Sequence, residues 1–149
     1  MAKTQAEQLL ESVGTLLQLF TVNEERFPSA EGRMRYNPID FQTLRFVHAH
    51  SGCRGIDAAK ALGVAPTTVQ SSLDRLIRNG LIDRKPHAVS KRAKAHFLTE
   101  EGQSVRAAIH RQDISNMETM LGVLSPDERA SVIEALNKVV ANLNQDAHA

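Results

Sequence analysis

The eleven residues from Ala59 to Val69 are the feature that most constrains the fold of this chain. An alanine begins the segment, Gly63 follows four residues later, and Val69 comes six residues after the glycine. The small alanine lets two helices cross closely, and glycine adopts the left-handed backbone of a tight turn without a Cβ clash. The valine can then pack the second helix into the bend of the first. This spacing predicts a helix-turn-helix, in which the second helix enters the major groove of DNA with its N-terminal residues toward the bases.

Two short helices are expected around this turn, near residues 57–62 and 66–79, and Gly80 can end the second. Val69, Leu73 and Leu76 lie three or four residues apart, so they share the face that anchors the second helix to its own domain. The opposite face carries hydroxyl and amide groups that can bond bases or phosphates, and a glutamine can pair with adenine through two hydrogen bonds. The residues expected to contact DNA from this helix are Pro66, Thr67, Thr68, Gln70 and Ser71.

The segment after this motif is strongly basic. Residues 75–99 contain seven Lys or Arg and one Asp, a net charge of +6 in a chain whose total is +1. Residues 81–98 also suit a two-stranded hairpin that bends near Pro86. A basic hairpin beside a recognition helix can reach the adjacent minor groove, where the potential is most negative. The basic residues expected to contact DNA are Arg75, Arg84, Lys91, Arg92 and Lys94.

Apolar stripes at helical spacing mark both ends of the chain. One follows the capping pattern Thr4-Gln5-Ala6-Glu7, and the other follows the capping pattern Ser125-Pro126-Asp127-Glu128. A single lobe of 149 residues would struggle to bury both stripes, so we expect a homodimer whose subunits bury them mutually. The stripes are Leu9, Leu10, Val13, Leu16, Leu17 and Phe20, and Val132, Ile133, Leu136, Val139, Val140 and Leu143.

Two further helices are expected between these ends. Asn37-Pro38-Ile39-Asp40 supplies a capping side chain, a proline at the first helical position and a carboxylate near the positive end of the helix dipole. This helix should run to about His50, after a loop at residues 26–36 and before a loop at residues 51–55. The other helix should open at Thr99 and run toward Leu121.

The downstream context of the motif makes it more specific. Asp74-Arg75-Leu76, the hairpin entry Gly80-Leu81-Ile82-Asp83-Arg84 and the exit Leu98-Thr99-Glu100-Glu101-Gly102 resemble the multiple-antibiotic-resistance-regulator (MarR) family. The resemblance covers nearly the whole chain. It implies a mainly α fold with a small β-hairpin wing, forming one domain over residues 1–149. The winged helix-turn-helix lobe would occupy about residues 38–99, and the dimerisation helices about residues 4–25 and 100–145.

The resemblance also implies a function. Family members are homodimers that bind a double-stranded, inverted-repeat operator, and they commonly repress transcription. They release DNA when a small aromatic or acidic effector, or an oxidant, reaches the protein. This chain departs from the family pattern in the residues that bear on operator preference and wing rigidity. Ser90 replaces an Asp two residues before Arg92, Gln70 and Ser71 stand where a basic residue is common, Ser72 replaces an apolar residue, and Ala65 replaces a capping Ser or Thr.

Four residues are candidates for an effector pocket between the dimer helices and the DNA-binding lobe, because they offer aromatic surface and an anchor for an anion. They are Tyr36, Phe41, Arg45 and His48. A redox- or metal-responsive regulator is the alternative. In that case Cys53 would sense oxidants with Arg54 stabilising its thiolate, or would join His48 and His50 at a metal.

Other classes of protein fit less well. The chain has no Gly-rich phosphate loop, nucleophile elbow or His-Glu-x-x-His helix, so we expect no enzyme, no cofactor and no bound metal. A winged-helix module that binds protein rather than DNA remains an alternative, but the basic segment argues against it because protein interfaces deplete lysine. The single cysteine, the absence of a signal-peptide layout and the absence of a long apolar run predict a cytoplasmic protein without a membrane partner, associated with the nucleoid when bound to DNA.

Overall fold

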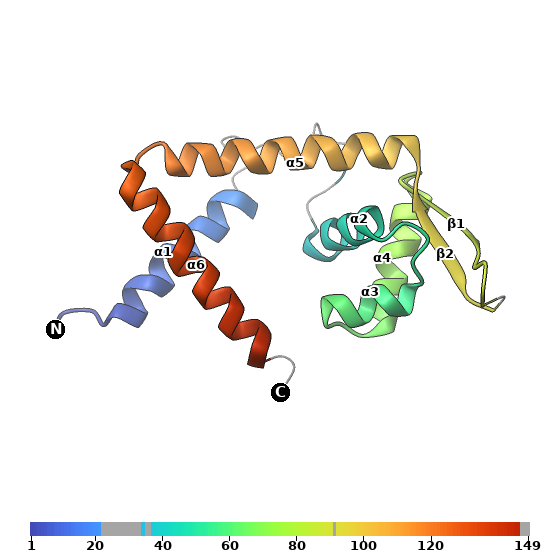
Figure 1. Cartoon of the computed structure of the whole chain (residues 1–149), viewed down its shortest axis with the longest axis horizontal. Coiled ribbons are helices and arrows are strands. Elements are labelled where there is room, and N and C mark those ends of the chain that lie inside the picture. The colour runs from blue at the N-terminus through green and yellow to red at the C-terminus, as the bar shows by residue number, and fades with distance from the viewer. Residues whose placement is uncertain (22–33, 35–36, 91, 147–149) are drawn as a thin grey trace. The chain divides into compact units, whose positions relative to one another are not determined.

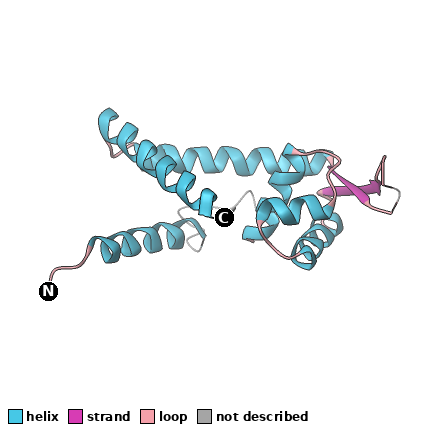
Figure 2. Cartoon of the chain, turned by 60° about the horizontal axis from the view of Figure 1, so that its bottom comes forward, coloured by secondary structure: helices cyan, strands magenta, loops and turns pink. Residues whose placement is uncertain are grey.

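The structure is a computed structural model that describes residues 1–21, 34, 37–90 and 92–146 (Figure 1). Its elements are α1 (Gln5–Thr21), α2 (Pro38–Ala49), α3 (Gly55–Leu62), α4 (Pro66–Arg78), β1 (Ile82–Pro86), β2 (Lys94–Leu98), α5 (Glu100–Leu121) and α6 (Pro126–Asp146). Helices dominate, and one antiparallel hairpin follows α4 (Figure 2), so the predicted fold class is confirmed. The chain divides into two compact units, residues 1–112 and 113–149. The loop expected at residues 26–36 lies outside the described residues except for Met34.

Side chains that accept from free backbone N–H groups mark the starts of α2 and α3. At α2, the Asn37 side chain accepts from the backbone N–H groups of Ile39 and Asp40, as predicted. Helix α3 starts two residues earlier than predicted, and the Asp57 carboxylate in its first turn bonds the residue before it, Arg54. The Arg54 N–H donates to the Asp57 carboxylate at 3.1 Å, and the guanidinium bonds the same carboxylate. Arginine is not a usual N-cap residue, so the sequence carried no ordinary signal for this start.

The helix-turn-helix predicted from residues 59–69 is present. Gly63 ends α3 with φ of 68°, which is the left-handed conformation that the spacing required. The N–H of Val64 donates to the carbonyl of Ala59 at 3.1 Å and closes the turn. Helix α4 begins with Pro66, and Gly80, with φ of 74°, lies two residues beyond its end.

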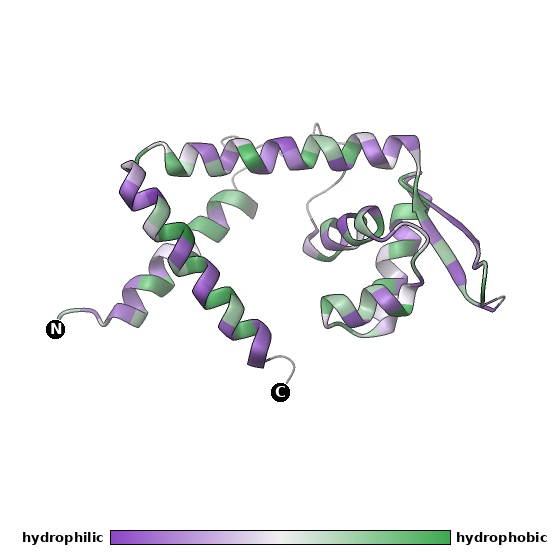
Figure 3. Cartoon of the chain, in the orientation of Figure 1, coloured by the Kyte–Doolittle hydropathy of each residue, from purple (hydrophilic) through white to green (hydrophobic). Residues whose placement is uncertain are grey.

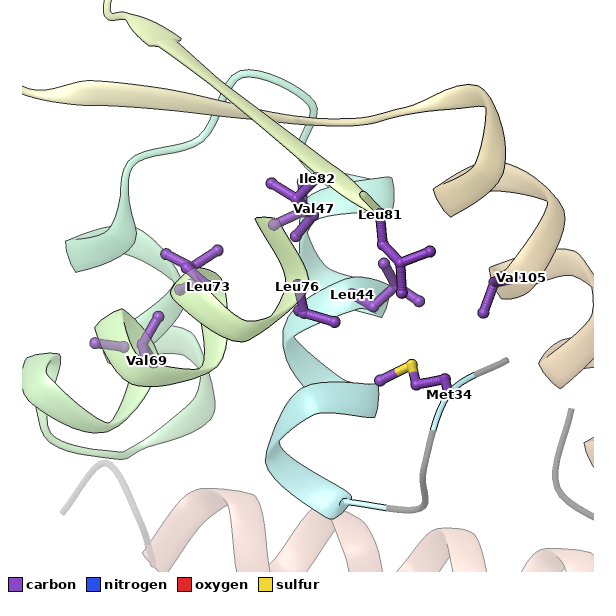
Figure 4. Close-up of a cluster of buried hydrophobic side chains, with 11 residues drawn as sticks. Met34, Leu44, Val47, Val69, Leu73, Leu76, Leu81, Ile82 and Val105 are labelled. Carbon is purple, nitrogen blue, oxygen red and sulfur yellow. The ribbon is translucent and has the colours of Figure 1, made fainter. Parts of the chain in front are cut away.

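One hydrophobic core joins α2, α3 and α4 to the starts of β1 and α5. Val69, Leu73 and Leu76 are at most 1% exposed, so the predicted anchoring face of α4 is confirmed. Figure 4 shows these side chains in the buried cluster to which α2 contributes Leu44 and Val47. The remaining buried members are Met34, Ala58, Ala59, Leu81, Ile82 and Val105. This packing fixes which face of α4 is left outside.

The hairpin is tied to the loop between α2 and α3. Strands β1 and β2 pair antiparallel, with Ile82 opposite Leu98 at the base. A single bridge joins Cys53 to His96 on the other side of β2. In it, the N–H of Gly52 donates to the His96 carbonyl at 2.8 Å, and the N–H of His96 donates to the Cys53 carbonyl at 3.0 Å.

The passage from β2 into α5 depends on Thr99 and Gly102. The Thr99 hydroxyl donates to the carbonyl of Gly80 at 2.6 Å and accepts from the N–H of Gly102 at 2.9 Å. The threonine therefore caps α5 and joins its start to the turn that follows α4. A Cβ atom on Gly102 would overlap the carbonyl oxygen of Leu81. Only glycine allows α5 to approach the backbone before β1 this closely.

Both predicted capping boxes form. At α1, the Thr4 hydroxyl accepts from the N–H of Glu7, whose carboxylate accepts from the N–H of Thr4. At α6, in the second unit, Ser125 and Glu128 make the same reciprocal pair. The hydrogen bonds from the cap residues lower the pKa of both glutamates.

The apolar stripes on α1 and α6 are exposed in the single chain. Leu10 on α1 is 72% exposed and Leu136 on α6 is 59% exposed, and α6 has no buried residue. Figure 3 shows the apolar colour recurring along each of these helices. Within the described part of the chain, no helix is both long enough and apolar enough to cross a membrane.

Candidate nucleic-acid interface

The outer face of α4 presents hydroxyl groups that the fold does not use. Thr67, Thr68 and Ser71 are exposed, and their hydroxyls form no hydrogen bond within the described residues. Pro66, which starts the helix, is also exposed. The buried side chains on the opposite face fix the rotation of the helix. The three hydroxyls are therefore free to donate to, or accept from, a molecule outside the chain.

Gln70 lies on the same outer face, and its amide is restrained. Its Nε2 donates to Oδ1 of Asp74, one helical turn later, at 2.9 Å. This bond uses one of the two N–H groups of the amide. The second N–H and the carbonyl oxygen remain, which are the two groups that a glutamine needs for a bidentate pair with adenine.

A polar cluster beneath α4 holds the helix to α2. Asp40 of α2 is 7% exposed, and its Oδ1 accepts from the hydroxyl of the fully buried Ser72 at 2.7 Å. The Arg75 guanidinium donates to both oxygens of the same carboxylate, at 3.0 and 2.8 Å. The hydrogen bond to Asp40 also raises the pKa of Arg75. Arg75, which was expected to contact DNA, is therefore engaged with α2, and Ser72 has a partner although its position is usually apolar.

Arg84 on β1 is likewise engaged inside the lobe. Its Nη2 donates to Oδ1 of Asp74 at 2.8 Å, and its Nε lies 3.3 Å from Nε2 of His96. The hydrogen bond from Arg84 holds the pKa of Asp74 below its usual range. The pair therefore joins the hairpin to α4 and offsets a carboxylate that would otherwise repel phosphate from this face.

Other cations of the hairpin and of α4 are not engaged in this way. Arg92 and Lys94 on the hairpin and Arg78 in the last turn of α4 are exposed and form no salt bridge within the described residues. Lys91 lies outside the described residues. Sequence reasoning missed Arg78, although it lies eight residues after Gln70 and hence on the same helix face.

An imidazole organises the tip of the hairpin. Nδ1 of His87 accepts from the backbone N–H groups of Val89 and Ser90, at 3.3 and 3.1 Å. The chain lacks the acidic residue that is common at the position of Ser90, and the His87 ring supplies the local contact that orders this turn. Farther down β1, the Lys85 ammonium lies 5.4 Å from the centre of the Phe97 ring, a cation–π contact.

The candidate effector residues that the structure describes differ in burial and in their contacts. Tyr36 lies outside the described residues. Phe41 packs against the hydrophobic core, and Arg45 is exposed. His48 is exposed as well, and its Nδ1 lies 3.1 Å from the side-chain oxygen of Gln103 on α5.

The environment of Cys53 does not favour redox chemistry. Burial, together with the nearby Asp57 carboxylate, raises the pKa of the Cys53 thiol to about 11. Because the reactive species is the thiolate, this thiol is protonated at neutral pH. The expectation that Arg54 stabilises the thiolate is wrong, since Arg54 pairs with Asp57 at 2.9 Å. The described residues also contain no group of three His, Cys, Asp or Glu side chains placed to hold a metal ion.

Comparison with known sequences gives two related results. Residues 36–93 match the model of the MarR family. The HTH-type transcriptional regulator YfiV of Bacillus subtilis is 24% identical over 96 residues, which are 64% of this chain. The match covers 60% of the length of that relative.

Solved structures share the fold over almost the whole chain. FabT of Streptococcus pneumoniae, in complex with DNA, has a TM-score of 0.77 at 22% identity and covers 94% of this chain and 95% of its own. A mutant of MepR from S. aureus has a TM-score of 0.76 at 25% identity, over 95% of this chain and 99% of its own. A crystal structure of MarR has a TM-score of 0.75 at 16% identity, over 97% of both chains.

Proposed function

We propose that this chain is a member of the MarR family, whose model matches residues 36–93, and that it is a DNA-binding transcriptional regulator: a ligand-responsive repressor that reads an inverted-repeat operator as a homodimer. Recognition helices of the two subunits would enter successive major grooves, with half-sites about 10 bp apart from centre to centre. Such a protein would work in the cytoplasm, on the nucleoid.

The outer face of α4 carries this proposal. It holds exposed Thr67, Thr68 and Ser71 hydroxyls without partners in the described chain, and a Gln70 amide with a free N–H and carbonyl. Hydrogen-bonding groups that are exposed, rigidly placed and unused by the fold are what direct readout of base edges requires. Pro66 would bring the backbone at the helix start close to phosphate.

The remaining cations would supply the sequence-independent part of the affinity. Arg92 and Lys94, with Lys91 between the strands, would contact the DNA backbone or the minor groove. Arg78 would add a phosphate contact from the end of α4. Arg75 and Arg84 would act indirectly, because their guanidinium groups already bind Asp40 and Asp74.

The proposed release of the repressor from DNA requires a site for an effector. An aromatic or acidic effector would bind near α2, where Phe41, Arg45 and His48 lie, and Tyr36 would join them. The alternative in which Cys53 senses oxidants loses support from the raised pKa of its thiol.

Selection of binding sites from random double-stranded DNA tests the proposal directly. We expect the purified protein to enrich one inverted repeat, and a DNase footprint on that site to protect both half-sites. Enrichment of no sequence, with binding that depends only on DNA length, would overturn the proposal of a specific regulator. In that case the same fold would be better explained as a winged-helix module that binds protein.

A further inference from the structure

A continuous series of polar contacts joins the outer face of α4 to both strands of the hairpin and to the loop before α3. Asp74 accepts from Gln70 and from Arg84, at 2.9 and 2.8 Å. Nε of Arg84 lies 3.3 Å from Nε2 of His96, and Nδ1 of His96 lies 3.0 Å from the carbonyl oxygen of Cys53. The series therefore starts at the side chain expected to read a base and ends in the body of the lobe.

The two contacts of His96 define the protonation state of its ring. A carbonyl oxygen can only accept, so Nδ1 must carry a proton and donate to Cys53. The Arg84 guanidinium can only donate, so Nε2 must lack a proton and accept from it. Both contacts together require a neutral imidazole with its hydrogen on Nδ1.

The surroundings of His96 favour that neutral state. The residue is 2% exposed. Its burial lowers its pKa, and the positive charge of Arg84 adds to this shift, while the bond to the Cys53 carbonyl and the negative charge of Asp74 oppose it without reversing it. Titratable or charged groups lie on each element packed around the ring: Arg84 of β1, Asp74 of α4 and the Cys53 thiol of the loop. Farther along are Asp57 of α3, which is paired with Arg54, and His50 after α2, whose ring bonds the Phe46 carbonyl.

We propose that His96 is a positioning residue for DNA recognition: its neutral ring holds Arg84 against Asp74, and protonation of the ring releases that arrangement. The inference rests on the proposed function, since it concerns how the hairpin and α4 are held for binding. A protonated ring would direct an N–H toward the Arg84 cation, so two donors would face each other. Arg84 would then leave the ring, and Asp74, which accepts from Gln70, would lose the partner that fixes its position.

The sign of the pH effect follows from this arrangement. The DNA-competent lobe binds fewer protons at His96 than a lobe in which the ring is released and solvated. Lowering the pH from about 7.5 to about 5.5, across the ordinary histidine pKa of about 6.5, should therefore weaken operator binding. The contact is one hydrogen bond, so we expect a loss of about two- to tenfold.

Three variants separate this effect from the other histidines of the chain. His96→Gln keeps a carbonyl oxygen that can accept from Arg84 and does not titrate. His96→Leu fills a similar volume but cannot accept a hydrogen bond. His110→Gln removes an exposed histidine of α5 and serves as the control. His87 at the hairpin tip is retained in all three proteins, so its titration cancels when their profiles are compared.

Operator affinity would be measured by fluorescence anisotropy between pH 5.5 and 8, on the inverted repeat selected as above. We expect the parent and His110→Gln to lose affinity toward acid by the same factor. His96→Gln should match the parent at pH 8 and lose about two- to tenfold less at pH 5.5. His96→Leu should bind about two- to tenfold more weakly at every pH. Equal pH profiles for the parent and His96→Gln, with normal binding by both, would overturn the proposal.

A second measurement does not depend on DNA. In ¹⁵N NMR spectra of the full-length protein, the His96 ring should be neutral and protonated on Nδ1 at pH 7.5, and the Arg84 Nε–H should exchange slowly with solvent. Both signatures should disappear together as the ring is protonated. A His96 ring protonated on Nε2 at pH 7.5 would contradict the geometry itself. If the NMR signatures are present and no protein binds DNA selectively, the proposed function has failed, and the role of His96 in recognition fails with it.

Discussion

Two buried hydroxyl groups on packed helices show how much a single hydrogen bond matters in this lobe. Ser72 on α4 and Thr43 on α2 are both fully buried. The Ser72 hydroxyl donates to Asp40, whereas the Thr43 hydroxyl has no hydrogen-bond partner among the described residues. A buried polar group without a partner costs the desolvation of that group, while a paired one recovers it.

Substitutions at these two sites should therefore change stability in opposite directions. Thr43→Val replaces the unpaired hydroxyl by a methyl group of similar size and should raise the free energy of unfolding by about 1 kcal/mol. Ser72→Ala leaves Asp40 with one donor fewer and should lower it by about 1–2 kcal/mol. Urea denaturation followed by circular dichroism would measure both, and a loss of stability in Thr43→Val would show that its hydroxyl is bonded.

Gln70 allows a test of recognition at the level of one side chain. Gln70→Ala should weaken binding to the selected operator by about 1–3 kcal/mol and leave binding to random DNA nearly unchanged. Gln42→Ala, on the exposed surface of α2, is a matched control that should leave both affinities unchanged. Unchanged discrimination between operator and random DNA in Gln70→Ala would remove this side chain from the readout.

Among the elements, the junction between β2 and α5 depends most on one residue type. Gly102 leaves no space for a side chain against the Leu81 carbonyl, whereas Gly14 in α1 has no atom within 4 Å of an added Cβ. Gly102→Ala should therefore lower the free energy of unfolding by about 3 kcal/mol through overpacking. The same substitution at Gly14 should raise it by about 0.5–1 kcal/mol through helix propensity. Equal effects at the two sites, measured by thermal unfolding at one protein concentration, would show that α5 does not approach the backbone so closely.

The hairpin should contribute affinity rather than sequence preference. Arg92→Ala and Lys94→Ala should each lower the slope of log affinity against log salt by about 1, with the same preferred operator. Lys138→Ala on α6 removes the same charge from another element and should leave the slope unchanged. If Arg92→Ala and Lys94→Ala bind like the parent at every salt concentration, the assignment of these residues to DNA contacts is wrong.

Most of the elements, but few of the partners inside them, could be predicted from the sequence. Caps, helical spacing and glycine positions are local signals, so the turn at Gly63 and the buried face of α4 were found correctly. The start of α3 was missed because the residue before it, Arg54, has no side-chain acceptor, and the Asp57 carboxylate bonds its backbone N–H instead. The engagement of Arg75 and Arg84 could not be foreseen, because it depends on which helix and strand pack beside α4. The DNA contacts themselves stay predictions.

At the scale of the whole molecule, the apolar faces of α1 and α6 require an explanation beyond one chain. Among others, Leu9, Leu10 and Leu17 on α1 and Leu136 and Leu143 on α6 are each at least 59% exposed. Burial of such surface stabilises an assembly by about 25 cal/mol per Å². A second subunit would provide that burial for both helices.

Light scattering at micromolar concentration should therefore give twice the 16.4 kDa mass of one chain. Leu136→Asp places a carboxylate in the apolar stripe of α6 and should shift the protein toward monomers. Ala141→Asp adds the same charge on the opposite face of that helix and should leave the mass unchanged. A monomeric mass for the parent would contradict the proposed dimer.

The two faces of α4 differ in burial, and this difference has a consequence for how related proteins diverge. Its inner face buries Val69, Ser72, Leu73 and Leu76 against the lobe, whereas Thr67, Gln70 and Ser71 on its outer face are exposed. Substitutions at Thr67, Gln70 or Ser71 can therefore alter the preferred operator with little effect on folding. After gene duplication, selection can change what one copy recognises through a few outward-facing codons, while the inherited scaffold stays intact.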